Sequence, residues 1–226
     1  MTDPRLAEHR AEIDRVKQVV TELHAELPAN ELVTWTAGNV SERVSGTDLF
    51  VIKASGARYH TLTADDMVVC DLAGVKVEGA RKPSSDTAAH AYVYQHMPEV
   101  NGVVHTHSTF ATAWSARREA IPCVLTMMAD EFGGDIPVGP FALIGDDSIG
   151  RGIVETLRGS RSRAVLMANH GPFTIGTSGL DAVKAAAMLE EVARTVHTAR
   201  LLGEPQRIEQ SDIDHLWDRY QNVYGQ

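Results

Sequence analysis

Two histidines separated by one residue occur in the segment "GVVHTHS", residues 102–108. In a strand, side chains two residues apart project from the same face, about 7 Å apart, so His105 and His107 are predicted to point the same way. Imidazole nitrogens bind Zn²⁺ at about 2.0–2.1 Å, and two rings at this spacing can lean toward one ion. The alternative is a pair half-buried in a strand and satisfied by backbone groups or water.

A third histidine favours the metal interpretation. His170, in "LMANHGPF", follows another apolar run and directly precedes a Gly-Pro turn. Loops at strand ends are where side chains from different strands converge. Three histidines would leave one position of a tetrahedral zinc site open, as a catalytic site requires. The remaining histidines are expected as solvated or packing residues, apart from His215, to which the sequence assigns no role.

Two short polar segments could bind an anion. Ser84, Ser85 and Asp86 lie at the predicted start of a helix, where free N–H groups favour negative charge. The alternative is simple N-capping, which needs only one such side chain. Ser55 and Gly56, in "VIKASG", offer backbone N–H groups in a turn that could approach an anion closely, or form an ordinary turn.

Hydrophobic spacing predicts the elements that would position these residues. The absence of a regular strand–helix alternation predicts one α+β or α/β layered domain over residues 1–226. The predicted elements are a helix over 4–27 that ends at Pro28, a strand over 49–53, a hairpin over 66–79, a helix over 83–97, a strand over 102–107, a helix to about 118, loops and short strands over 120–150, a strand–turn–strand over 162–176, a helix over 178–202 and a last helix within 212–226.

Composition excludes several classes of function. The net charge is −9 with a pI near 5.5, and no basic stripe of the kind nucleic-acid binders carry is present. No run approaches the roughly 18 apolar residues of a membrane span, and the N-terminus is charged from its start. Cys70 and Cys123 are far apart in the sequence and form no metal-type pair. Nothing else indicates an oxidising compartment, so we expect a cytoplasmic protein. No dinucleotide or Walker fingerprint occurs.

Six segments in the same order resemble the class II aldolase/epimerase superfamily, from about residue 10 to the C-terminus. These segments are "TAGNVS", "VIKASG", "KPSSDTAAH", "GVVHTHS", "NHGPF" and the terminal "YGQ". Within the superfamily the chain looks most like bacterial L-ribulose-5-phosphate 4-epimerases, with L-fuculose-1-phosphate aldolases more distant. The resemblance implies a central, mainly antiparallel sheet flanked by helices, and a homotetramer with active sites at subunit interfaces.

The resemblance also implies roles for individual residues. Zn²⁺ would be held by His105, His107 and His170, with Asp86 as a further ligand or an acid/base group. Asp130 and Tyr224 would transfer protons on opposite faces, the latter reaching into a neighbouring subunit. The phosphate of a ketose phosphate would be bound by a set of six residues, namely Asn39, Lys53, Ser55, Gly56, Ser84 and Ser85.

Each of these roles has an ordinary alternative. Lys53 could be a solvated strand end, and Asn39 a turn residue that tolerates left-handed backbone. Asp130 could belong to a solvated acidic pair, and Tyr224 could be a packing residue. Two departures from the family pattern also occur, because Met128 replaces an expected histidine and the spacing of His215 and Arg219 does not match cleanly.

The expected reaction converts L-ribulose 5-phosphate to D-xylulose 5-phosphate by carbon–carbon cleavage and re-addition. The alternative is an aldolase acting on a ketose phosphate such as L-fuculose 1-phosphate. Aldolases of the family typically carry Glu where this chain has Asp86, which favours the epimerase. Zinc-dependent hydrolysis ranks lower, since the further His and Asp ligands that zinc hydrolases carry late in the chain are lacking. A non-catalytic binding role also ranks lower, since such a protein would be expected to have lost the three histidines.

Overall fold

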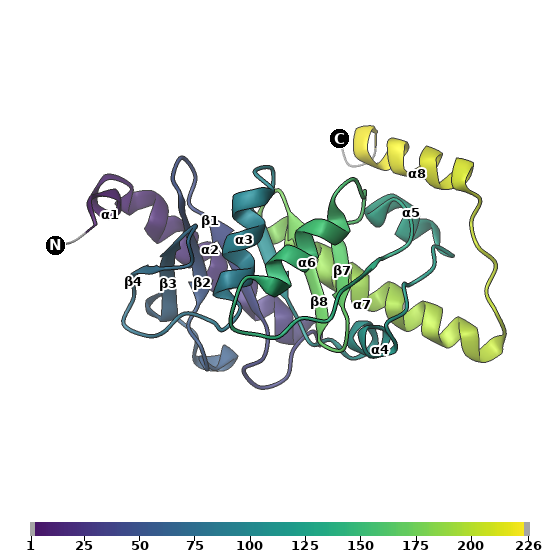
Figure 1. The fold of residues 1–226 in the computed structure, drawn as a ribbon, viewed down its shortest axis with the longest axis horizontal. Coiled ribbons are helices and arrows are strands. Elements are labelled where there is room, and N and C mark those ends of the chain that lie inside the picture. The colour runs from purple at the N-terminus through teal and green to yellow at the C-terminus, as the bar shows by residue number, and fades with distance from the viewer. Residues whose placement is uncertain (1–2, 224–226) are drawn as a thin grey trace.

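Eight strands form one sheet that runs through the middle of the molecule (Figure 1). The computed structural model describes residues 3–223. The strand order is β4-β3-β2-β1-β5-β8-β7-β6. The strands are β1 (Asn39–Arg43), β2 (Leu49–Lys53), β3 (Met67–Asp71), β4 (Lys76–Glu78), β5 (Gly102–His105), β6 (Val138–Gly139), β7 (Ala164–Met167) and β8 (Gly171–Gly176).

The sheet is mainly antiparallel, as predicted, but it is mixed. Every neighbouring pair from β4 to β7 is antiparallel, whereas the two-residue strand β6 pairs with β7 in parallel. Strands β2, β5, β7 and β8 are buried along their whole length. Their β-branched and aromatic side chains therefore pack on both faces of the sheet, which requires helices on both sides.

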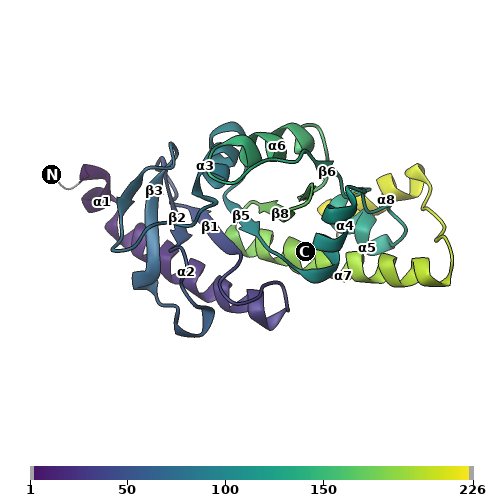
Figure 2. The same ribbon diagram turned by 60° about the horizontal axis from the view of Figure 1, so that its bottom comes forward.

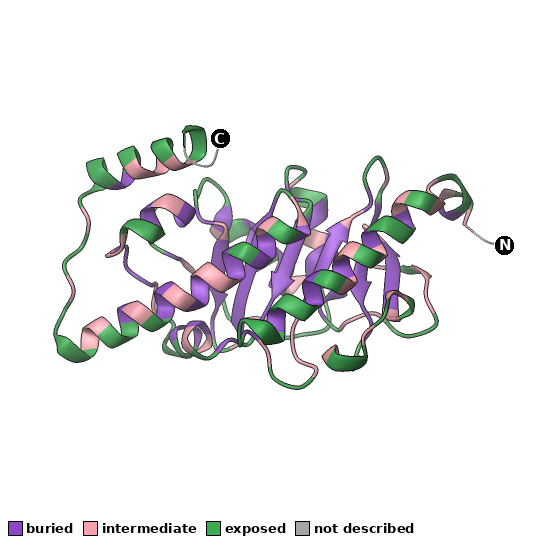
Figure 3. Cartoon of the chain, turned by 180° about the vertical axis from the view of Figure 1, so that it is seen from behind, coloured by how far each residue is buried: buried purple, intermediate pink, exposed green. Residues whose placement is uncertain are grey.

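Helices cover both faces of the sheet. Helices α3 and α6 lie on one face, and α2 and α7 cross the other with their inner sides buried (Figures 2 and 3). None of the helices in the described part of the chain is long and apolar enough to cross a bilayer. The helices are α1 (Pro4–Glu8), α2 (Arg10–Ala29), α3 (Thr87–His96), α4 (Thr109–Arg117), α5 (Thr126–Phe132), α6 (Ser148–Leu157), α7 (Gly179–Leu202) and α8 (Gln210–Asn222), with 3₁₀ turns at Tyr59–Thr61 and Ala64–Asp66.

The first predicted helix is two helices. The chain breaks at His9, and the Asp3 side chain caps α1 by accepting from the backbone N–H of Arg5. Pro28 does not end α2, because it lies inside the last turn and the helix continues to Ala29. Proline removes one N–H donor but leaves the carbonyls free, and Asn30 caps the end by donating to the Glu26 carbonyl.

Four elements depart from the sequence prediction. The strand predicted over 102–107 ends at His105, so His107 lies in the turn that leads into α4. The polar segment 39–43 is a central strand, β1, and the region 120–150 contains α5 and the start of α6. Helix α6 was not predicted, because its glycines disfavour a helix in isolation. A Cβ at Gly150 would lie 2.6 Å from the Ala89 carbonyl oxygen, so glycine permits α6 to approach α3 closely.

Candidate active site and metal centre

Three strands bring the histidines together. His105 is the last residue of β5, where it pairs with Asn39 of β1 on one side and Phe173 of β8 on the other. His170 lies in the turn between β7 and β8, after Asn169, whose φ of 57° is left-handed. One potential ligand atom from each of the three histidines lies within 4.8 Å of the others.

The protonation state of His105 follows from its hydrogen bond. Its Nδ1 lies 2.9 Å from the Pro172 carbonyl oxygen, which can only accept, so Nδ1 carries the proton. Burial lowers the pKa of His105 to about 3, so the ring is neutral and Nε2 presents a lone pair. That Nε2 lies 3.0 Å from Nε2 of His107. A carbonyl that fixes the tautomer of a histidine in this way is typical of metal ligands.

These residues fit a metal ion. Two nitrogen ligands of a tetrahedral zinc ion are separated by about 3.3 Å when each bond is about 2.0–2.1 Å. The two Nε2 atoms are already near that spacing, and Nδ1 of His170 is buried with no hydrogen-bond partner among the described residues. A cation bound among the three rings would give their ligand nitrogens, which lie within 4.8 Å of one another, a shared partner.

Asp86 lies at the N-terminus of α3 but does not cap it. It is the N-cap residue, yet its side chain makes no capping hydrogen bond. Instead its Oδ2 accepts from Nδ2 of Asn39 at 2.7 Å. Burial acts to raise the pKa of Asp86, but His105 and the other polar neighbours outweigh it and hold that pKa below its usual value. The capping alternative for this residue is therefore wrong, and its carboxylate belongs to the histidine site.

One cavity of about 310 Å³ contains nearly all of the predicted site. Its lining includes the three histidines, Asp86 and all six residues expected to bind phosphate. The sequence prediction missed the remaining lining residues. Thr36, Ala37 and Gly38 come from the loop before β1, and Ile144 comes from the loop between β6 and α6. Ile144 carried no polar signal in the sequence, so only the fold could identify it.

Lys53 is buried rather than solvated. Its side chain is among the largest fully buried ones, and Nζ donates to the carbonyls of Thr36 and Ala57 at 3.2 Å each. Burial lowers the pKa of its ammonium group to about 8. The solvated strand end considered for this residue is therefore wrong, and Lys53 places a cation at the wall of the cavity.

The remaining predicted residues lie elsewhere. Asp130 is on α5 and does not line the cavity; one of its carboxylate oxygens, Oδ1, is buried with no hydrogen-bond partner among the described residues. Burial raises the pKa of Asp130, although Arg219 acts in the opposite direction. His215 is exposed on α8. Tyr224 lies outside the described residues.

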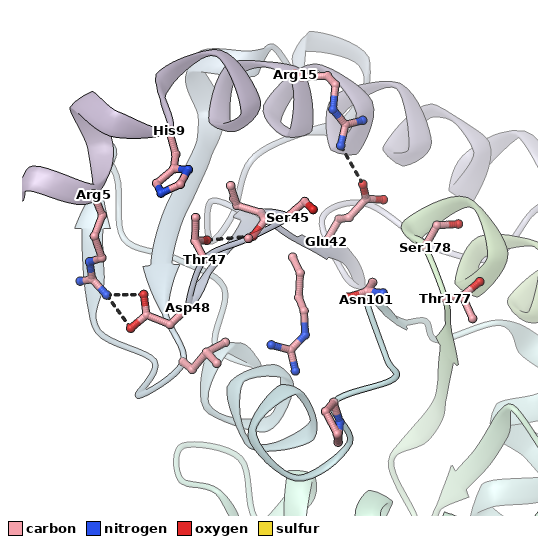
Figure 4. Close-up of a pocket in the computed structure, with 15 residues that line it drawn as sticks. Arg5, His9, Arg15, Glu42, Ser45, Thr47, Asp48, Asn101, Thr177 and Ser178 are labelled. Carbon is pink, nitrogen blue, oxygen red and sulfur yellow. Dashed lines mark hydrogen bonds and ion pairs between the residues drawn. The ribbon is translucent and has the colours of Figure 1, made fainter.

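A larger cavity, of about 730 Å³, lies at the other end of β1 (Figure 4). Its charged residues are already paired with one another or with neighbours. Arg5 binds Asp48 at 2.8 Å, and Arg15 binds Glu12 at 2.8 Å. The histidine cavity is the better candidate for chemistry. Its nitrogen atoms and carboxylate line one space, and Oδ1 of Asn39 and Nδ1 of His170 are buried without a hydrogen-bond partner in residues 3–223.

The fold and cavity define a protein of the class II aldolase type. Residues 18–197 match the model of the family described as Class II Aldolase and Adducin N-terminal domain, and the chain belongs to this family. Membership supports an enzyme of the aldolase, or lyase, class.

Solved structures agree with this assignment. An L-fuculose 1-phosphate aldolase matches with a TM-score of 0.86 at 29% identity, covering 92% of this chain and 96% of that one. YgbL from Klebsiella pneumoniae matches with a TM-score of 0.79 at 29% identity, covering 90% and 98%. The L-fuculose-1-phosphate aldolase from Thermus thermophilus matches with a TM-score of 0.70 at 25% identity, covering 85% and 96%.

Proposed function

We propose that this protein is a metal-dependent enzyme that cleaves a carbon–carbon bond of a phosphorylated sugar by retro-aldol chemistry. The observation that carries the proposal is that a metal-type histidine cluster and an anion-type pocket share one cavity of about 310 Å³. Catalysis of this reaction needs both features in one space, since one end of the substrate must be held while a bond at the other end breaks.

The histidine end would stabilise negative charge. His105, His107 and His170 would hold Zn²⁺, which suits a set of neutral imidazoles. Such an ion supplies Lewis-acid stabilisation of the charge that develops on the carbonyl fragment, an effect of several kcal/mol. The pairing of His105 Nδ1 with the Pro172 carbonyl keeps the ligand nitrogen turned inward without reorganisation.

Other residues of the same cavity would hold the phosphate. Lys53 offers a positive charge there, and Ser55, Gly56 and the start of α3 offer hydroxyl and backbone N–H groups. Gly56 has φ +66°, and no atom lies within 4 Å of the position where a Cβ would stand. A phosphate could therefore approach the backbone of this turn closely.

Proton transfer needs groups on both sides of the reacting carbon. Asp86 is the carboxylate already inside the cavity, and it suits either metal binding or proton transfer. We propose that Asp130 and Tyr224 transfer protons on opposite faces, with Tyr224 reaching into the site from a neighbouring subunit of a homotetramer, as the family resemblance implies.

Two reactions share this cleavage step. An aldolase releases the fragments, and the likeness to two L-fuculose-1-phosphate aldolases supports that outcome. An epimerase retains the aldehyde, rotates it and rejoins it, and Asp86 in place of Glu favours conversion of L-ribulose 5-phosphate to D-xylulose 5-phosphate. Both reactions involve soluble metabolites. The free, buried thiols of Cys70 and Cys123 support the proposal of a reducing, cytoplasmic location.

A two-substrate assay of the zinc-reconstituted protein tests the proposal. We expect either release of dihydroxyacetone phosphate and lactaldehyde from L-fuculose 1-phosphate, or formation of D-xylulose 5-phosphate from L-ribulose 5-phosphate. A wider set of pentulose and hexulose phosphates covers other ketoses. Failure to convert any of them, by a protein shown to contain one metal ion per chain, would overturn the proposed reaction.

A further inference from the structure

The wall of the cavity that would hold the phosphate carries one strong cation. Among the described residues that line the cavity, Lys53 is the only lysine or arginine. A phosphate monoester carries about 1.5 to 2 negative charges near pH 7, and the carboxylate of Asp86 lines the same space. Lys53 alone therefore does not balance the charge of the phosphate, and a second cation nearby would stabilise the bound ligand.

Arg81 lies beside this wall, on the outer side of the Ser55–Gly56 turn. Its Nη2 donates to the carbonyl oxygen of Ser55 at 3.3 Å, and its Nη1 forms an ion pair with Oδ1 of Asp66 at 2.8 Å. The other oxygen of Asp66, Oδ2, accepts from the backbone N–H of Thr63 at 3.1 Å. The guanidinium group is therefore held between two structured turns, so its position relative to the cavity is defined.

The bond to the Ser55 carbonyl also orients the next N–H group. The carbonyl of Ser55 and the N–H of Gly56 belong to one planar trans peptide, so they point in opposite directions. Arg81 engages the carbonyl from outside the cavity, and Gly56 lines the cavity. The N–H of Gly56 forms no hydrogen bond within residues 3–223, so it is available to an anion.

The charge of Arg81 also acts on the ammonium group inside the cavity. Burial is the main cause of the lowered pKa of Lys53, and the positive charge of Arg81 is the next. The other titratable groups around that ammonium are Asp66, Asp86, His24 and Tyr59. The side chain of Arg81 is 44% exposed, so salt screens part of its field.

We propose that Arg81 is a positioning residue for the phosphate-binding turn. It holds the Ser55 carbonyl outward so that the Gly56 N–H faces the phosphate, and its charge adds to that of Lys53. The inference rests on the proposed function of the cavity, because the turn matters to catalysis only if phosphate binds there. It deepens that proposal by adding a residue that acts on the phosphate from outside the cavity wall.

Binding of inorganic phosphate to the zinc-loaded protein, measured by calorimetry, tests this role. Arg81→Met should weaken binding about three- to tenfold at low salt, and less at about 1 M salt, where the screening length falls to about 3 Å. KM for the sugar phosphate should rise by a similar factor, with kcat within about twofold. Arg81→Lys keeps the charge but not the planar fork, so its affinity should lie between those of Arg81→Met and the wild type.

Arg151→Met is the matched control, because it removes an equal charge from an exposed ion pair with Asp147 on α6. It should bind phosphate as the wild type does. Equal phosphate affinity of Arg81→Met and Arg151→Met would overturn the proposal.

Two measurements without phosphate keep the test independent of the proposed function. Amide hydrogen exchange at residues 55–57 should be faster in Arg81→Met than in Arg151→Met, because the Ser55 carbonyl loses its side-chain donor. NMR titration should show a higher pKa of Lys53 in Arg81→Met, since a neighbouring positive charge is lost, and the wild-type pKa in Arg81→Lys.

Unchanged exchange would overturn the positioning role of Arg81, and an unchanged pKa of Lys53 would overturn its contribution of charge. Absence of phosphate binding by the wild type would instead count against the proposed function, and the two measurements without phosphate would still decide on Arg81.

Discussion

The carboxylate of Glu190, in the middle of α7, accepts a hydrogen bond from the backbone N–H of Ala111 at 2.9 Å. Its other oxygen accepts from the N–H of Phe110 at 2.8 Å. Ser108 is the N-cap residue of α4, yet its side chain makes no capping bond, so Glu190 performs this function from a distant helix. Since His107 directly precedes the N-cap residue Ser108, this contact also fixes the turn that carries a predicted metal ligand.

Removal of this remote cap should affect both stability and metal binding. We expect Glu190→Ala to lower the free energy of unfolding by about 1–3 kcal/mol, because the buried N–H of Ala111 and the part-buried N–H of Phe110 lose their acceptor. Zinc affinity should fall as well, since the turn at His107 loosens. Urea unfolding and calorimetric titration with Zn²⁺ measure the two effects. Glu191→Ala is the matched control, because Glu191 forms an exposed ion pair with Arg194. Equal behaviour of the two variants would contradict this assignment.

Lys53 should make phosphate binding dependent on pH. With its pKa lowered to about 8, the ammonium group is charged below that pH and becomes neutral above it. Binding of inorganic phosphate, or KM for the sugar phosphate, should therefore weaken as the pH rises from about 7 to 9. Lys53→Met should weaken binding about tenfold or more and abolish this pH dependence.

Exposed Lys76 provides the comparison for that experiment. Lys76→Met should retain both the affinity and the pH profile of the wild type. A profile that is unchanged in Lys53→Met would place the titrating group elsewhere.

His24 should make the fold sensitive to acid. The neutral ring is fully buried, with Nδ1 bonded to the Val20 carbonyl and Nε2 accepting from the N–H of Val40. Burial lowers its pKa to about 3, against about 6.5 in the unfolded chain. The unfolded state therefore binds the proton first. Stability is fully present above pH 6.5 and is lost as the pH falls from 6.5 toward 3.

The contribution of His24 predicts how steeply the free energy of unfolding changes with pH. We expect His24→Leu to be less stable than the wild type at pH 7 but to lose about 1.4 kcal/mol less per pH unit between pH 6 and 4.5. Urea unfolding across that range measures the difference. His60→Gln, a change at an exposed histidine, should keep the wild-type slope. Parallel curves for wild type and His24→Leu would rule out this source of acid sensitivity.

Much of the site could be predicted from the sequence because its chemistry is carried by unusual residues in short segments. The spacing of His105 and His107, and the histidine in the turn before β8, identified the histidine cluster that could hold a metal ion. The prediction that His105 and His107 point the same way assumed a strand over both residues. The two rings do lie together, although β5 ends at His105. Convergence of the two rings depends on their local separation, which the turn into α4 preserves.

The elements that the sequence analysis missed share a physical cause. Strand β1 carries Asn39, Ser41 and Glu42, whose polar side chains are buried in specific hydrogen bonds, so hydrophobic alternation does not mark it. Helix α6 contains Gly150, where a Cβ would collide with Ala89 and Tyr92 of α3, and Gly152, where a Cβ would collide with Met167 and Pro140. Contacts with distant parts of the chain determine that β1 and α6 form, and the hydrophobic periodicity of the local sequence does not reveal such contacts. The hydrogen bond from Asn39 to Asp86 likewise joins residues 47 positions apart.

The metal content of the purified protein tests the central claim most directly. After removal of metal and reconstitution with Zn²⁺, elemental analysis and calorimetry should show one tightly bound ion per wild-type chain. His107→Ala and His170→Ala should each weaken binding at least about 10- to 100-fold, whereas His60→Ala, at an exposed histidine outside the cavity, should bind as the wild type does. Absence of stoichiometric binding by the wild type, or undiminished binding by the two site variants, would contradict the account.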